Sequence, residues 1–178
     1  MARIKGSQLA DVIVGVRGLR DRNALVVPEH LEKYFEESVL YSNWYPEVDF
    51  RDLIVLLGRA LQSSFDGNVW RYLGKQGAAR DVAGAYSIWV RGGDPERTLQ
   101  KLNQGWTAVR DSGRMTVSTL GPKEAEIMVR AYPAMCPELA EINAGYLEEM
   151  LRASGAIDVD VQIREIMDAG CRWKAAWR

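Results

Sequence analysis

The hydrophobic spacing of this 178-residue chain changes near Gly105, and that change constrains the fold more than any other feature. Before Gly105, apolar residues recur every three or four positions, as they do on one face of a helix. After Gly105 they alternate in two pairs of short segments, as they do in strands with one buried face. Helices and strands that are segregated along a chain predict an α+β fold with an antiparallel sheet.

The length of the chain suits one domain. We therefore expect a single domain over residues 1–178, with a mainly helical half over 1–104. Residues 105–178 are expected to form an antiparallel sheet with one long helix, in the order β-β-α-β-β. The helical half packs on this sheet in the predicted arrangement.

The first predicted strand pair is "GRMTVSTLG" and "KEAEIMVRAY", joined by a turn at Gly121-Pro122. A long helix is expected from Pro137 to Gly155, which supplies the stop. The last pair is "AIDVDVQIREIM" and "CRWKAAWR", joined by a turn at residues 168–170. The core-facing residues of this pair are predicted to be Ile157, Val159, Val161, Ile163 and, at the end of the row, Glu165, together with Cys171, Trp173, Ala175 and Trp177.

The helical half shows several start and stop signals. Ser7 is expected to cap a helix that runs to about Arg20, and Asp49 to cap one over residues 50–62. Asp94 and Pro95 are typical of a helix start, and this helix is expected to end near residue 103. The other helices are predicted over residues 29–40, from 66 to between 74 and 77, and over 79–90.

Charge, hydropathy and cysteine content disfavour several classes of protein. The 23 basic and 24 acidic residues are well mixed and give a net charge of −1, which disfavours binding to nucleic acid. The apolar stretch near the N-terminus is interrupted by Asp11 and Gly15 and is too short to span a bilayer. Two cysteines, Cys136 and Cys171, do not make a disulfide framework, so we expect a cytoplasmic protein with reduced thiols.

The second half of the chain resembles a known superfamily. The resemblance rests on "DSGR" before a strand, the paired strands, "GYLEEMLRASGA" before an alternating strand, and the closing Cys-x-Trp. These are similar to the C-terminal half of the superfamily that joins four-vinyl-reductase-type ligand-binding domains, haem–nitric-oxide-binding domains and TRAPP vesicle-tethering subunits. The full chain, including "IKGSQL", "SNWYPEVDFRDL" and "RGGDPERTLQ", is similar to uncharacterised proteins of this superfamily that are abundant in myxobacteria.

The resemblance implies a ligand-sensing or protein-docking module, often dimeric, with an apolar cavity between helices and sheet. It implies no known reaction. Zinc-binding relatives use several cysteines near the end of the chain, where only Cys171 matches, so we expect no metal even though Cys136, Glu165 and Asp168 could complete a set. Haem needs an axial ligand, usually histidine, and the only one here is His30, far from the segment that carries it in relatives. No cofactor is expected.

Catalysis is also disfavoured. One histidine without a recognisable nucleophile beside it does not make a triad. The carboxylate pairs Glu36/Glu37 and Glu148/Glu149 are interpreted as solvated helix faces. The glycine clusters match neither the phosphate loop nor the dinucleotide fingerprint.

The aromatic residues are the remaining signal of function. Aromatic and methionine side chains either line an apolar ligand pocket or simply fill the core. The candidate ligand-binding residues are Trp44, Tyr45, Trp70, Tyr86, Trp89, Trp106, Met115 and Met128.

Two functions follow from these alternatives. The first is a non-catalytic sensor domain that binds an apolar or aromatic molecule, or a lipid chain, and signals to a protein partner as a homodimer. The second is a dimeric scaffold or adaptor without a ligand, similar to tethering-complex subunits, with a large apolar surface patch.

Overall fold

The computed structural model describes residues 1–178 apart from the side chain of Ala85. The chain forms two compact units. The first, which we call the helical unit, contains residues 1–69 and 109–111, and the second, the sheet unit, contains residues 70–108 and 112–178. Residues 70–104, which were predicted to belong to the helical half, are therefore part of the sheet unit.

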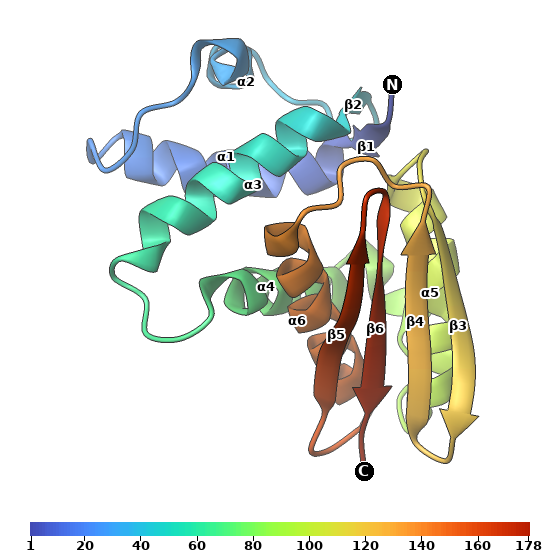
Figure 1. The fold of residues 1–178 in the computed structure, drawn as a ribbon. Coiled ribbons are helices and arrows are strands. Elements are labelled where there is room, and N and C mark those ends of the chain that lie inside the picture. The colour runs from blue at the N-terminus through green and yellow to red at the C-terminus, as the bar shows by residue number, and fades with distance from the viewer. The chain divides into compact units, whose positions relative to one another are not determined.

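The sheet unit contains the predicted α+β arrangement (Figure 1). The four strands are antiparallel and lie in the order β3-β4-β6-β5. The long helix α6, Pro137–Ala153, connects the two strand pairs, which confirms the predicted β-β-α-β-β order. The strands are β3 (Arg114–Gly121), β4 (Glu124–Arg130), β5 (Asp160–Met167) and β6 (Gly170–Ala176).

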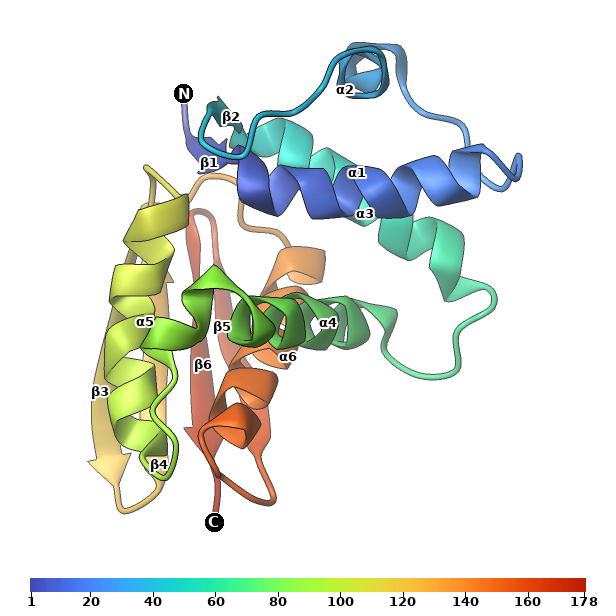
Figure 2. The same ribbon diagram turned by 180° about the vertical axis from the view of Figure 1, so that it is seen from behind.

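One face of the sheet is covered by α6 and by α5, Pro95–Val109, as Figures 1 and 2 show. Trp173 in the central strand β6 is fully buried on this face and donates its indole N–H to the carbonyl of Ala140, 3.0 Å away. The predicted core row of the last strand is confirmed, because Cys171, Trp173, Ala175 and Trp177 are all buried.

A β-bulge between Ile163 and Glu165 corrects one detail of β5. The extra residue shifts the alternation, so Glu165 pairs with Arg172 and leaves the core-facing row in which it was predicted. Its carboxylate forms an ion pair with Arg172 at 3.1 Å on the other face of the sheet. That face carries mainly charged and polar side chains, as is common for an antiparallel sheet with one solvated side.

The two helices predicted between residues 66 and 90 are replaced by one helix and a short 3₁₀ segment. The helix α4 runs through Val69–Ala83, and η2, Ala85–Trp89, follows it. Gly74 does not end the helix but lies at its crossing with α6, where a Cβ atom would come 1.9 Å from the carbonyl oxygen of Ile142. This close approach explains why position 74 is a glycine, which has no Cβ atom.

The helical unit is built around the packing of α1 on α3 (Figure 1). The buried face of α1 includes Leu9, Ile13 and Val16, and that of α3 includes Leu53 and Leu57. The elements are β1 (Arg3–Lys5), α1 (Gly6–Arg20), η1 (Glu29–Leu31), α2 (Lys33–Glu36), β2 (Trp44–Pro46) and α3 (Glu47–Gln62).

The predicted caps of α1 and α3 are corrected. The helix α1 begins at Gly6 and α3 at Glu47, and no side chain caps either one. Asp49 lies inside the first turn of α3, where its buried carboxylate accepts a 2.6 Å hydrogen bond from the hydroxyl of Tyr34 and lies 2.9 Å from Lys33 Nζ. Asp49 therefore ties α2 to α3 instead of starting a helix.

The short segment 109–111 pairs with the N-terminal strand of the helical unit. Arg110 forms an antiparallel bridge with Ile4, and the backbone and side-chain nitrogens of Arg3 each donate to Asp111 at 2.6 Å. The fully buried carboxylate of Glu47 lies 3.1 Å from Arg110 Nε. These contacts fix the segment that follows α5 onto the helical unit.

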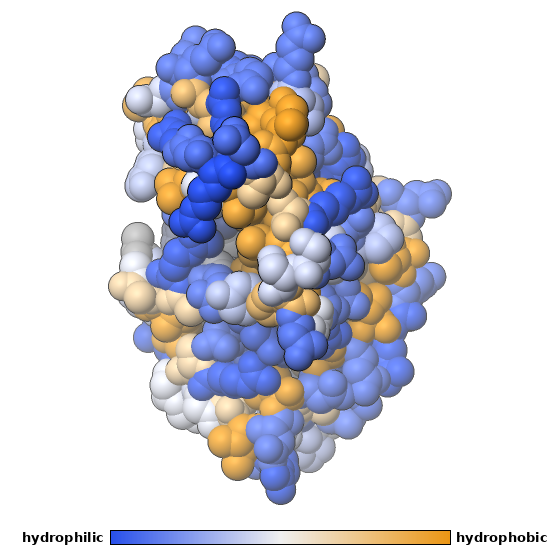
Figure 3. Space-filling model, turned by 90° about the vertical axis from the view of Figure 1, so that its left-hand side faces the viewer, coloured by the Kyte–Doolittle hydropathy of each residue, from blue (hydrophilic) through white to orange (hydrophobic). Residues whose placement is uncertain are grey.

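Some apolar side chains of the helical unit remain exposed, among them Val14 at 69% and Val26 at 87%. On the face drawn in Figure 3, hydrophobic residues gather in the upper part among hydrophilic ones. Within the described part of the chain, no helix is long and apolar enough to cross a membrane.

Candidate functional site

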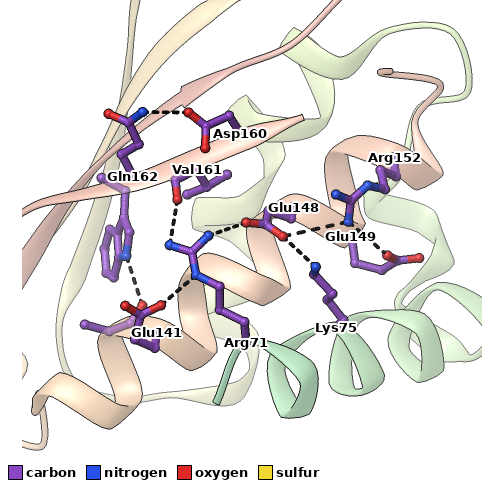
Figure 4. A network of polar contacts seen from close by, with 11 residues as sticks. Arg71, Lys75, Glu141, Glu148, Glu149, Arg152, Asp160, Val161 and Gln162 are labelled. Carbon is purple, nitrogen blue, oxygen red and sulfur yellow. Dashed lines mark hydrogen bonds and ion pairs between the residues drawn. The ribbon is translucent and has the colours of Figure 1, made fainter. Parts of the chain in front are cut away.

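Arg71 of α4 lies at the centre of a polar network in the sheet unit (Figure 4). Its Nε lies 2.6 Å from Glu141 Oε2, its Nη1 is bonded to Glu148 Oε1, and its Nη2 donates to the carbonyl of Val161 at 2.9 Å. One guanidinium group thus joins α4, α6 and β5. Such forked, charge-assisted bonds are the strongest hydrogen bonds that side chains make.

Glu148 of α6 also lies close to two other cations. Its carboxylate lies 2.8 Å from Lys75 Nζ and 3.8 Å from Arg152 Nη1, and its side chain is 7% exposed. Burial alone would lower the pKa of Arg71, but hydrogen bonds and charge interactions with Glu141 and Glu148 raise that pKa above its ordinary value. The network therefore favours the charged form of Arg71.

Two glycines bring α4 and α6 close enough for this network. A Cβ atom on Gly145 of α6 would come 2.1 Å from the carbonyl oxygen of Arg71, and Gly74 of α4 faces the carbonyl of Ile142 in the same manner. Because neither glycine has a side chain, the two backbones touch. Tyr146 adds a 2.8 Å hydrogen bond from its hydroxyl to Asp81 of α4.

This arrangement is suited to holding elements together rather than to proton transfer. Each nitrogen of the Arg71 guanidinium has an acceptor, and the Glu148 carboxylate lies among three cations. A general acid or base must be able to gain or lose a proton near the working pH. Arginine cannot do so.

This network was not predicted from the sequence. Glu148 was predicted to lie with Glu149 on a solvated face, which is wrong for Glu148, since only 5% of that residue is exposed. The available signal was a charge pattern: Arg71 and Lys75 are four residues apart and Glu141 and Glu148 are seven apart, so each pair lies on one helix face.

Two predicted pocket residues, Trp44 and Tyr45, lie in β2 of the helical unit. Lys5 Nζ lies 4.4 Å from the centroid of the Trp44 ring, a cation–π contact. Tyr45 packs edge-on against Tyr34, with ring centroids 6.0 Å apart, and its hydroxyl accepts a hydrogen bond from the backbone N–H of Leu40 at 2.9 Å.

The other six predicted pocket residues lie in the sheet unit. Trp70 is half-buried on α4. Tyr86 and Trp89 of η2 stack with ring centroids 4.8 Å apart and an interplanar angle of 9°. The Trp89 ring also covers Gly105 of α5, where a Cβ atom would come 2.9 Å from Trp89 Cε3.

Trp106 forms a separate cluster. Its ring packs edge-on against Tyr132 at 5.0 Å, and its indole N–H donates to the carbonyl of Ser112 at 2.9 Å. Met115 is buried opposite Val129, whereas Met128 pairs with Thr116 and so lies on the other face of the sheet. The structure therefore joins Tyr86 with Trp89, and it does not bring Met115 and Met128 to one side of the sheet.

The fold is that of the H-NOX domains. The chain is similar to an oxygen-binding H-NOX domain related to soluble guanylate cyclases, with 11% identity, a TM-score of 0.66, and coverage of 98% of this chain and 95% of that one. A mutant H-NOX domain of T. tengcongensis gives 11% identity and a TM-score of 0.62 over 95% and 96% of the two chains. An iron(II) unliganded H-NOX mutant from K. algicida gives 10% identity and 0.62 over 98% and 97%.

The sequence itself defines the family. The chain belongs to the family described as proteins of unknown function, DUF2378, whose model matches residues 36–178. No curated protein matches the chain.

Two of the similar structures, one of them from the H-NOX family, are described by their haem. An axial ligand is usually a histidine or a thiolate. The only histidine, His30, lies on η1 with a side chain 58% exposed, and its Nε2 is 3.7 Å from Asp52. Burial raises the pKa of the Cys171 thiol to about 12, which keeps it neutral. The described residues therefore do not fit a haem held by a buried histidine or by Cys171.

A metal ion finds no better site. Among the described residues, no three His, Cys, Asp or Glu side chains gather in a way that could hold an ion. Cys171 is buried on the helix-covered face of the sheet, while Glu165 lies on the other face with Arg172. Two of the metal ligands considered from the sequence, Cys171 and Glu165, therefore lie on opposite faces of the sheet.

Proposed function

We propose that this protein is a non-catalytic, sensor-type domain that binds a small apolar or aromatic molecule, or a lipid chain, without haem. The observation that carries the proposal is the extent of the fold similarity, which covers 98% of this chain and 95% of an oxygen-binding H-NOX domain. The position of its only histidine, exposed on η1, supports a ligand that differs from haem.

The state of the charged groups supports a role without catalysis. The polar network around Arg71 has its arginine bonded on every side and serves to join α4, α6 and β5. A binding domain needs such a rigid frame, because a ligand shifts an equilibrium between states only if each state is well defined.

The predicted pocket residues of the sheet unit, apart from Met128 on the other face of the sheet, remain the candidates for contact with the ligand. We propose further that the protein acts in the cytoplasm as a homodimer and passes its change of state to a protein partner. The partly exposed aromatic groups of the sheet unit, such as Trp70 and the Tyr86–Trp89 stack, are the side chains that an apolar ligand would reach.

Native and denaturing mass spectrometry of freshly purified protein tests the proposal. We expect a mass excess that is lost on denaturation, and no Soret absorption. Trp70→Leu, which alters a candidate residue, should lower the bound fraction, whereas Tyr41→Leu should not, because Tyr41 lies outside the set and is 68% exposed.

Two results would contradict the proposal. Stoichiometric haem uptake that His30→Ala abolishes would show a haem sensor. A dimer that carries no adduct, also after incubation with a mixture of fatty acids and aromatic metabolites, would favour the scaffold function instead.

A further inference from the structure

The outer surface of α5 and the preceding connection carry three cations beside a pair of stacked aromatic rings. Arg97 and Lys101 are four residues apart on α5, and Arg91 lies in the connection between η2 and α5. We call these three side chains, together with Tyr86 and Trp89, the α5 surface. All five belong to the sheet unit.

The connection that presents Arg91 is held by hydrogen bonds. The backbone N–H of Arg91 donates to Thr98 Oγ1 at 2.9 Å, and its carbonyl accepts from the N–H of Asp94 at 3.0 Å. Gly93 N–H donates to the carbonyl of Ser154 at 2.9 Å, which attaches the connection to the end of α6. Arg91 is therefore fixed beside the first turn of α5.

The aromatic pair continues the same helix face. Arg97, Lys101 and Gly105 follow one another at four-residue steps and so lie on one side of α5. Trp89 lies directly over Gly105, and Tyr86 stacks on Trp89. The cations and the rings thus form one continuous strip.

The three cations of this strip, Arg91, Arg97 and Lys101, are not held in ion pairs within the described part of the chain. Among the described residues, the one carboxylate that bonds here, Asp94, accepts the backbone N–H of Arg97 at 3.0 Å. Loss of contact with water and the positive charges of Arg91 and Arg97 lower the pKa of Lys101. An anionic partner would relieve this repulsion.

The geometry of the aromatic rings indicates which class of anionic partner the α5 surface fits. A nucleobase would need a free ring face, but the Trp89 ring already stacks on Tyr86 and lies against the Cβ position of Gly105. The indole N–H of Trp89 has no hydrogen-bond partner among the described residues, and the neighbouring Ile88 is 64% exposed. Tryptophan is typical of proteins at a membrane interface, because its ring is apolar and its N–H can bond to water or lipid headgroups. Here the ring lies close to cations and to an exposed aliphatic side chain.

We propose that the α5 surface docks the protein reversibly on a membrane with anionic lipids. Arg91, Arg97 and Lys101 would contact the lipid phosphates, and Ile88 with the edge of Trp89 would enter the headgroup layer. This proposal rests on the cations and on Ile88 and not on the proposed ligand. Because Tyr86 and Trp89 are also candidate ligand residues, the variants that test the docking leave both rings unchanged.

Co-sedimentation with lipid vesicles tests the docking. We expect the full chain to bind vesicles of 70% phosphatidylcholine and 30% phosphatidylglycerol, and not vesicles of pure phosphatidylcholine. Binding should fall steeply as sodium chloride is raised, since exposed charges are screened. The double substitution R97Q/K101Q should weaken binding by about 25-fold, at about fivefold for each cation near the surface.

The matched control is R22Q/R164Q, which removes the same charge from two exposed arginines outside the α5 surface. It should change binding by less than about twofold if the α5 surface is the docking site. Ile88→Ser should weaken binding several-fold, and Ile157→Ser, an equally exposed isoleucine at 62%, should not.

Three results would overturn the proposal. One is equal binding to neutral vesicles, and another is an equal loss in the two double variants, which would show a simple effect of net charge. The third is binding to single-stranded DNA that depends on Arg97 and Lys101 without binding to vesicles, which would identify a nucleic-acid surface.

Discussion

The two units join their helices in different ways. In the helical unit, α1 and α3 meet through aliphatic side chains, and the hypothetical Cβ of Gly15 faces the flexible end of Leu57 at 3.0 Å. In the sheet unit, α4 and α6 meet backbone to backbone, at Gly74 and Gly145. A side-chain contact can adjust to a substitution by a change of rotamer, whereas a contact between two backbones cannot.

The difference extends to charge. The crossing of α4 and α6 is surrounded by Arg71, Lys75, Glu141 and Glu148, while the facing sides of α1 and α3 are apolar. Apolar contacts stabilise the packing of two helices but allow more than one relative position. Buried charge pairs stabilise the one position in which the charges meet. We therefore expect the α4–α6 contact to be the less tolerant of the two.

The largest effect is expected for Gly145→Ala. The new methyl group would come 2.1 Å from the carbonyl oxygen of Arg71, so the helices would have to separate. We expect a loss of about 3 kcal/mol or more in the free energy of unfolding, measured with urea. Gly18→Ala on α1 is the control, because nothing lies within 4 Å of its Cβ position, and it should stabilise the protein by about 1 kcal/mol.

Equal effects of these two substitutions would break the comparison. They would mean that α4 can move away from α6 as easily as a surface helix accepts a methyl group. Circular dichroism of both variants distinguishes a loss of packing from a loss of helix.

The second effect is expected for Glu148→Gln. This substitution leaves Arg71 and Lys75 without their shared carboxylate in a nearly buried place, at a cost of about 2 kcal/mol after allowance for the exposed quarter of Arg71. Glu149→Gln changes the neighbouring carboxylate, whose side chain is 31% exposed and 3.8 Å from Arg152. Urea unfolding should show a change below about 0.5 kcal/mol for this control.

A destabilisation by Glu149→Gln as large as that by Glu148→Gln would contradict this view of the network. The charge of α6 as a whole would then matter more than the position of one carboxylate.

These contacts show what could be predicted from the sequence. The alternation that ends in Cys171, Trp173 and Ala175 correctly predicted the last strand, because alternation depends on local geometry and on one buried face. The bulge at residue 164 was not predictable from alternation, since it follows from pairing with β6, and it moved Glu165 to the other face.

The crossing of α4 and α6 was missed for a related reason. A glycine is a common helix stop, so Gly74 was interpreted as an end, although its real constraint is a helix that lies about 70 residues further along the chain. The two short strands β1 and β2 also depend on partners distant in sequence. Local patterns therefore predicted the elements, and long-range contacts determined the candidate site.

The third prediction concerns the buried polar contact of the helical unit, between Tyr34 and Asp49. Burial, then the hydrogen bond and charge of Asp49, raise the pKa of the Tyr34 hydroxyl well above its ordinary value of about 10. The neutral hydroxyl donates to Asp49, so its contribution to stability is complete below pH 10 and is lost as the pH rises further. Tyr34→Phe should cost about 1 kcal/mol at pH 7.

Urea unfolding of wild type and Tyr34→Phe at pH 7, 9 and 10.5 measures this dependence. The difference between the two proteins should be constant up to pH 9 and should shrink in more alkaline solution. A difference that grows with pH would show that the phenolate is favoured in the fold.

The smallest effect is expected for an ion pair of the same chemical type as the Arg71 network but placed in solvent. Arg20 Nη1 lies 2.9 Å from Glu32 Oε2, with side chains 41% and 32% exposed. A double-mutant cycle of Arg20→Gln and Glu32→Gln should give a coupling of about 0.5 kcal/mol or less, and 0.5 M sodium chloride should remove it. The cycle of Arg71→Gln and Glu148→Gln should give a larger coupling that persists in salt, because burial limits screening. If both couplings vanish in salt, the ion pairs of the Arg71 network are screened as surface ion pairs are. Only the backbone contacts at the two glycines would then distinguish the α4–α6 contact from the α1–α3 contact.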